Sequence, residues 1–128
     1  MGRTGASQVA AEHHVVYLLS MRGYEASLPE KTGGDIFVCS ADGLRLALLQ
    51  VFVLDDSGRA RRHDSLAVAR NRACVAVELG GLDHVPVYFV VPSVVFAQAT
   101  VWSRSSLLPY RDAWRLLGLD GPRLRIAS

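Results

Sequence analysis

Apolar residues near the start of the chain recur with helical spacing, and this spacing predicts a helix over residues 6–22. Gly23 follows the last turn, a position where helices commonly end. On a helical wheel the apolar side chains gather within about 60° of Glu12. They are Val9, Val15, Val16 and Leu19. The one carboxylate of this predicted helix therefore lies in the middle of its apolar stripe, where an unpaired charge is costly.

Short apolar segments then alternate with polar turns, and these segments predict strands. They cover residues 24–28, 35–39, 44–54 and 85–91. The dipeptide Asp42-Gly43, between the second and third segments, is a strong signal for a hairpin. The third segment is almost wholly apolar, which is typical of a strand that is buried on both faces.

The remaining segments complete the predicted fold. The apolar positions of residues 64–79 and of residues 110–117 indicate helices, whereas residues 93–102 fit either a helix or a strand. A succession of strand, helix and strand over residues 44–91 implies two parallel strands with a right-handed crossover. We therefore expect a three-layer α/β domain, in which helices flank a mixed β-sheet.

Length and composition fit a single domain over residues 1–128, with a core at 7–118 and a short tail at 119–128. Half of the 128 residues are hydrophobic and a fifth are charged, so the chain can bury a core. No run of 18 apolar residues predicts a membrane span, and no signal-peptide pattern precedes the first helix. Two cysteines are too few for a disulfide framework. These features predict a cytoplasmic protein without a membrane partner.

The predicted hairpin brings candidate site residues to one face of the sheet. A two-residue turn pairs Asp35 with Gln50 across the two strands, about 5 Å apart. Phe52 shares the face of Gln50 because side chains alternate along a strand. We expect Glu12, on the first helix, to pack over these residues. Two carboxylates and an amide oxygen are hard ligands that suit Mg²⁺ or Mn²⁺.

The chain resembles the PD-(D/E)XK nuclease superfamily in Glu12 on the first helix and in the segments RGYEASLP, GDIFV and LLQV. The similarity is greatest to the small restriction-endonuclease-like and Holliday-junction-resolvase-like members. It covers residues 7–54, and more weakly residues 85–92 and the segment PYRDAW. The resemblance implies a restriction-endonuclease-like fold with Glu12, Asp35 and Gln50 at catalytic positions. It also implies that Asp35 and Gln50 bind Mg²⁺ or Mn²⁺.

One position departs from the family pattern. The lysine that orients and activates the attacking water in the family falls on Phe52 in this chain. Phenylalanine supplies no positive charge where negative charge develops during phosphodiester hydrolysis. The only lysine in the chain is Lys31, in the loop before Asp35, and it is the candidate for a relocated catalytic cation.

Three functions are compatible with this departure. The favoured one is a degenerate nuclease-like domain that is related to nucleic acid and has low or no catalytic activity. The second is an active metal-dependent DNA endonuclease or resolvase that uses Lys31. The third is a dimerisation or protein-interaction module without nucleic acid, and the apolar residues 93–102 are its expected contact in a homodimer.

A basic segment favours DNA as a partner. Five arginines lie within residues 59–72 against a single acidic residue, although the net charge of the whole chain is only +2. They are Arg59, Arg61, Arg62, Arg70 and Arg72. Such a cluster is typical of contacts with phosphates. No Phe, Trp or Tyr lies among these arginines, so the cluster does not predict stacking on single-stranded bases.

Overall fold

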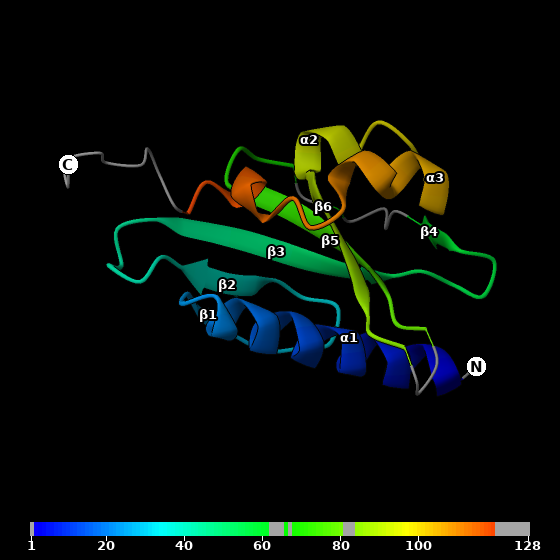
Figure 1. Cartoon of the computed structure of the whole chain (residues 1–128), viewed down its shortest axis with the longest axis horizontal. Helices are drawn as coiled ribbons and strands as arrows, with labels where there is room; N and C mark the ends of the chain where they lie inside the picture. Colours follow the sequence, from blue (N-terminus) through cyan, green and yellow to red (C-terminus); the bar gives the residue numbers. More distant parts are fainter. Residues whose placement is uncertain (1, 62–65, 67, 81–83, 120–128) are drawn as a thin grey trace.

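A five-stranded mixed sheet lies between helix α1 on one side and helices α2 and α3 on the other (Figure 1). The computed structural model describes residues 2–61, 66, 68–80 and 84–119. The sheet has the order β1-β2-β3-β5-β6, in which β3 and β5 are parallel and the other neighbours are antiparallel. Its strands are β1 (Glu25–Ser27), β2 (Ile36–Cys39), β3 (Leu46–Val53), β5 (Arg72–Glu78) and β6 (Val87–Pro92). The three-layer α/β fold with a mixed sheet is therefore confirmed.

Helix α1 (Gly2–Met21) confirms the first predicted helix and covers one face of the sheet. Its inward side chains Ala11, Val15 and Leu19 are fully buried there. Glu12 is only 3% exposed, so a carboxylate does lie on the buried side of this helix. Among the described residues, no helix is long and apolar enough to cross a membrane.

The β2–β3 hairpin has the register that its turn predicts. The pairs run from Ile36 with Leu49 to Cys39 with Leu46. Gly43 adopts a positive φ of 74°, and the Asp42 carboxylate accepts hydrogen bonds from the Ser40 hydroxyl and from the backbone N–H of Leu44. These bonds, the one from Ser40 above all, hold the pKa of Asp42 below its usual range. The predicted strands at residues 24–28 and 85–91 are also present, as β1 and β6.

The helix predicted over residues 64–79 is wrong, because Arg72–Glu78 form strand β5. Strand β5 lies between β3 and β6, parallel to β3 and antiparallel to β6. Strands β3 and β6 therefore run in opposite directions, and the predicted parallel crossover between them is wrong. The five central residues of β5 are all buried. A short apolar run that is buried on both faces has no period that separates a strand from a helix. Residues 64, 65 and 67 lie outside the described part of the chain.

The single helix predicted over residues 110–117 is wrong, because this segment holds the end of one 3-10 turn, a break, and a second 3-10 turn. The described elements after β6 include the helices α2 (Ser93–Phe96) and α3 (Arg104–Leu107) and the 3-10 turns η1 (Leu108–Tyr110) and η2 (Trp114–Leu117). Asp112 interrupts the helical path with a φ of 51°, and its backbone N–H donates to the carbonyl of Tyr88 in β6. This tertiary bond fixes the break between the two turns, and a helical pattern in the sequence does not reveal it.

Residues 93–102, which fit either structure in the sequence, contain both a helix and a strand. Helix α2 is followed by β7 (Val101–Ser103), which pairs with β4 (Arg59–Arg61) in a separate two-stranded sheet. The rings of Phe96 and Trp102 stack 5.5 Å apart inside a second core, on the sheet face away from α1. The aromatic residues of this segment therefore pack within the domain, whereas Val94 is 50% exposed, and the expected homodimer contact stays a prediction.

The two cysteines differ in access, and we expect them to differ in reactivity. Cys74 in β5 is fully buried, and this burial raises the pKa of its thiol to about 12. Cys39 in β2 is partly exposed. An aromatic disulfide reagent at pH 8 should therefore label Cys39 alone in the folded protein and both thiols in denaturant, as counted by absorbance. Labelling of a folded Cys39→Ser variant would contradict the buried position of Cys74.

Candidate functional site

Glu12 connects α1 to the loop that precedes β2. Its carboxylate accepts hydrogen bonds from the backbone N–H of Gly33 at 2.8 Å and from the side-chain amide of Gln8 at 2.9 Å. The Gln8 amide also donates to the carbonyl oxygen of Val51 in β3, at 2.9 Å. Because Glu12 is almost inaccessible to water, these donors replace the hydration of its carboxylate. Helix, loop and sheet are joined at this one side chain.

Gln50 in β3 forms a hydrogen bond with the same glycine, at the backbone carbonyl group of Gly33. Its side-chain Nε2 donates to the carbonyl oxygen of Gly33 at 3.3 Å. Gly33 has a φ of +90°, a conformation that favours glycine over all other residues. Glu12 and Gln50 therefore do converge, as the sequence predicts, but they converge on the backbone of Gly33.

Asp35 lies immediately before β2 and forms an ion pair with Arg72, the first residue of β5. The Arg72 Nη1 atom is 2.9 Å from the Asp35 Oδ1 atom. Both side chains are partly exposed, at 32% for Asp35 and 23% for Arg72. This pair spans strand β3, because β3 lies between β2 and β5 in the sheet. One of the arginines expected to contact DNA is therefore engaged by a candidate metal ligand.

Phe52 is a core residue, as its apolar character predicts. It is 2% exposed, and its ring centroid lies 4.8 Å from that of Phe96 in α2. Aligned pairing with β5 puts Gln50 beside Cys74 and Phe52 beside Ala76, so Gln50 and Phe52 share one sheet face as predicted. The position that the resemblance assigns to a lysine is thus filled by a ring packed under α2.

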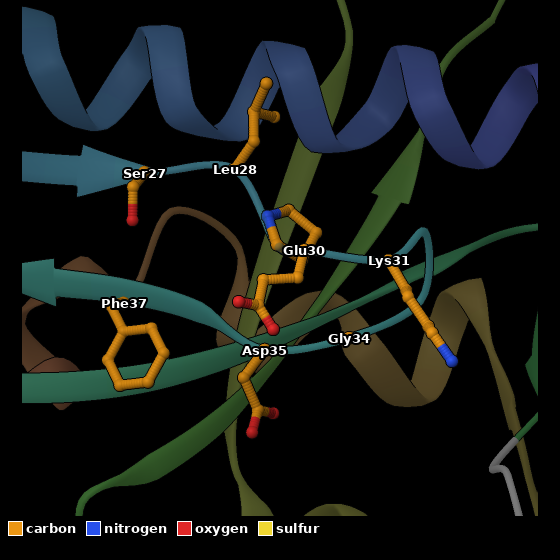
Figure 2. Close-up of a pocket in the computed structure, with 8 residues that line it drawn as sticks. Ser27, Leu28, Glu30, Lys31, Gly34, Asp35 and Phe37 are labelled. Atoms are coloured by element: carbon orange, nitrogen blue, oxygen red, sulfur yellow. The ribbon is translucent and has the colours of Figure 1, made fainter.

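A cavity of about 790 Å³ opens beside Asp35 (Figure 2). Its lining consists of Ser27, Leu28, Pro29, Glu30, Lys31, Gly34, Asp35 and Phe37. Lys31 and Asp35, which the sequence links only through the family pattern, both line this space. The Phe37 ring stands on the same side of the chain as the Asp35 carboxylate in Figure 2, and its side chain is 53% exposed.

The candidate ligands are a poor fit for Mg²⁺ or Mn²⁺. The Asp35 carboxylate already has a guanidinium partner, and the Glu12 carboxylate is enclosed by two N–H donors. The Gln50 amide nitrogen donates to Gly33, and this bond does not use the amide oxygen that a metal would take. Within the part of the chain that the structure describes, no three His, Cys, Asp or Glu side chains gather as a metal site. The predicted metal at Asp35 and Gln50 stays a prediction.

The predicted arginine cluster is distributed over several elements. Arg59 and Arg61 flank the buried Ala60 on β4, and both are exposed. Arg70 is exposed in the segment that leads into β5, whereas Arg72 contacts Asp35. Arg62 lies outside the described residues. The exposed members of the cluster within the described residues are therefore Arg59, Arg61 and Arg70.

Sequence reasoning missed Gln8 and Phe37 as contributors to this site, and it missed the contact that Arg72 makes with Asp35. Gln8 lies one helical turn before Glu12, and that spacing is a usable signal for a side-chain pair. Arg72 falls within the helix predicted over residues 64–79, which conceals its alignment with Asp35 across the sheet. In the sequence, Phe37 is one residue of a predicted apolar strand. Its exposure depends on the sheet face around it being left uncovered, which the sequence pattern does not show.

Comparisons with protein-family models, with curated proteins and with solved structures found no match to this chain.

Proposed function

We propose that this domain is a nuclease-like scaffold that binds the phosphate backbone of DNA and does not cleave it. The observation that carries the proposal is the state of the catalytic positions implied by the resemblance. Asp35 is neutralised by Arg72, and the lysine position holds Phe52 inside the core. Hydrolysis of a phosphodiester needs an activated water and positive charge near the scissile phosphate. Phe52 supplies neither at the position of the family lysine.

The proposed binding rests on exposed arginines beside the two-stranded sheet. Arg59 and Arg61 project from the same side of β4, because Ala60 between them points into the core. Arginine forms paired hydrogen bonds with phosphate oxygens and displaces counterions from DNA. Two adjacent exposed guanidinium groups on a strand therefore fit neighbouring phosphates of a backbone.

A second candidate, an active endonuclease, is favoured by one observation. Lys31 and Asp35 line the same cavity, so a lysine and a carboxylate are available at one open surface (Figure 2). In this alternative Lys31 supplies the charge that Phe52 lacks.

Cleavage of supercoiled plasmid and of branched DNA separates the two candidates. We expect no nicking by the wild-type protein in Mg²⁺ or Mn²⁺ above the level of an Asp35→Ala variant. Asp35→Ala is a fair control because loss of a partly exposed ion pair costs roughly 1 kcal/mol of stability or less. Metal-dependent nicking that disappears in Asp35→Ala and in Lys31→Gln would establish the active enzyme.

DNA affinity should depend steeply on salt, and it should depend on β4. We expect the double variant Arg59→Gln, Arg61→Gln to bind duplex DNA more weakly. The slope of log K against log salt should become shallower by about 0.9 for each phosphate that the variant no longer neutralises. The matched control is the double variant Arg22→Gln, Arg115→Gln, which removes two exposed arginines elsewhere on the surface. Fluorescence anisotropy across a salt series measures both, and equal effects of the two double variants would contradict a binding surface at β4.

A further inference from the structure

The sheet face opposite α1 is covered over only part of its width. Helices α2 and α3 lie over β5 and β6, away from β1 and β2 (Figure 1). The second core takes its sheet residues from β5, β6 and the end of β3, and none of the described residues of β1 or β2 belongs to it. The same face of β1, β2 and the start of β3, here called the open face, therefore lies outside that core.

The centre of the open face is apolar. Phe37 and Cys39 alternate along β2 with residues that are buried against α1, so both point to the opposite side. The hairpin register pairs Phe37 with Leu48 and Cys39 with Leu46, which places all four side chains together. Phe37 is 53% exposed and Leu46 is 47% exposed. An apolar patch that is continuous over two strands is typical of a surface that contacts another protein.

Charges of opposite sign flank this apolar patch. On one side, Glu25 in β1 pairs with Cys39, and its neighbour Ala26 packs toward α1, so Glu25 belongs to the open face. On the other side, Arg72 in β5 is aligned with Leu48 in β3. Across β1, β2, β3 and β5 the open face is therefore acidic, apolar, apolar and basic.

We propose that two copies of this chain pack open face against open face, around a two-fold axis that runs along the strands between β2 and β3. This rotation places β2 over the partner's β3, and β1 over the partner's β5. Phe37 then meets Leu48 of the partner subunit, and Glu25 comes within reach of Arg72 of the partner subunit. Each contact occurs twice, because a two-fold interface is self-complementary. Two sheets that pack face to face in this way form a common type of core.

The order of the charges favours a second copy over an unrelated protein. A partner must present a basic, two apolar and an acidic position at the spacing of neighbouring strands, and the open face itself presents this series after a two-fold rotation. A two-fold axis across the strands would instead place the two acidic β1 strands over each other, and facing like charges disfavour association. The inference goes beyond the proposed function, because Arg59 and Arg61 lie in the separate sheet of β4 and β7.

Sedimentation velocity of the full chain, without DNA, measures the association. We expect wild-type protein to pass reversibly from monomer to dimer as its concentration rises. Phe37→Ser should raise the dissociation constant at least about tenfold, because an aromatic side chain at the centre of an interface carries much of its affinity. The matched control is Tyr17→Ser on α1, because Tyr17 is also an exposed aromatic residue, at 66%. Circular dichroism establishes that both variants are folded.

A charge exchange tests the orientation of the two copies. Glu25→Arg and Arg72→Glu should each weaken the dimer, because each variant alone sets like charges against each other twice. An equimolar mixture of the two variants should associate more tightly than either variant alone, because every contact between unlike copies then joins a carboxylate to a guanidinium. A folding defect in one variant cannot produce this recovery.

The reactivity of Cys39 gives a readout that needs no variant. The pseudo-first-order rate constant for its reaction with an aromatic disulfide reagent should fall as protein concentration rises, because Cys39 lies in the apolar patch. The reaction still goes to completion through the monomer. A rate constant that is the same for monomer and dimer would contradict a contact at the open face.

The remaining outcomes also decide the matter. A wild-type protein that stays monomeric up to millimolar concentration would overturn the dimer. Equal dissociation constants for Phe37→Ser and Tyr17→Ser would overturn the open face as the contact, and a mixture of the charge variants that associates no better than its components would overturn the two-fold arrangement. None of these experiments contains DNA, so their failure is distinct from a failure of DNA binding.

Discussion

Replacement of Phe52 by lysine is expected to unfold the domain or to remove most of its stability. The side chain is 2% exposed and its ring packs against Phe96. Truncation of a buried phenylalanine costs about 3–5 kcal/mol, and lysine adds the cost of burying an ammonium group. Domains of this size are usually stable by only about 5–15 kcal/mol. Urea denaturation followed by circular dichroism should report a loss of at least about 4 kcal/mol in the free energy of unfolding.

The control for this variant keeps a large apolar side chain and adds no charge. Phe52→Met should cost about 1.5 kcal/mol or less, because methionine adapts to the shape of an apolar core. A Phe52→Lys protein that keeps the wild-type free energy of unfolding would contradict the packed position of Phe52. If that protein also nicked plasmid DNA in Mg²⁺, the absence of a lysine at this position would be what prevents cleavage by the wild-type protein, and the proposal of binding without cleavage would apply to the wild-type residue alone.

The sequence is a good guide to the first half of this fold because its signals there are local. The apolar stripe of α1 and the Asp42-Gly43 turn each specify a structure within a few residues, and the turn fixes the register of the hairpin. Strand β5 has no such signal, because its apolar residues are buried on both faces. The break at Asp112 depends on a hydrogen bond to β6, an earlier element that the local pattern around Asp112 does not encode.

The sequence predicts which residues lie at the candidate site, but it does not predict which groups those residues contact. The alternation of side chains places Gln50 and Phe52 on one face, as the structure confirms. The partner of Asp35 is Arg72, and that contact exists only because β5 is a strand aligned with β3. The partner of Glu12 is a backbone N–H, which every residue but proline carries and which no side-chain pattern can identify.

Replacement of Glu12 by alanine is expected to loosen the loop that carries Lys31. Alanine leaves the N–H of Gly33 without its acceptor and removes one partner of the Gln8 amide. Loss of one member of a buried, charge-assisted hydrogen-bond pair costs about 1.5–3 kcal/mol. Urea denaturation should report a decrease of this size in the free energy of unfolding. Hydrogen exchange followed by mass spectrometry should report faster exchange of a peptide that contains Gly33.

Two variants separate the hydrogen bond from the charge. Glu12→Gln retains a side-chain oxygen that can accept from Gly33, so it should lose less stability than Glu12→Ala and should keep the loop protected from exchange. Glu30→Ala removes an exposed carboxylate from the same loop and should change the free energy of unfolding by about 0.5 kcal/mol or less. If Glu12→Ala were as mild as Glu30→Ala, the carboxylate would not be what holds Gly33. The loop would then be fixed from the sheet alone, through the bond from Gln50 to the Gly33 carbonyl.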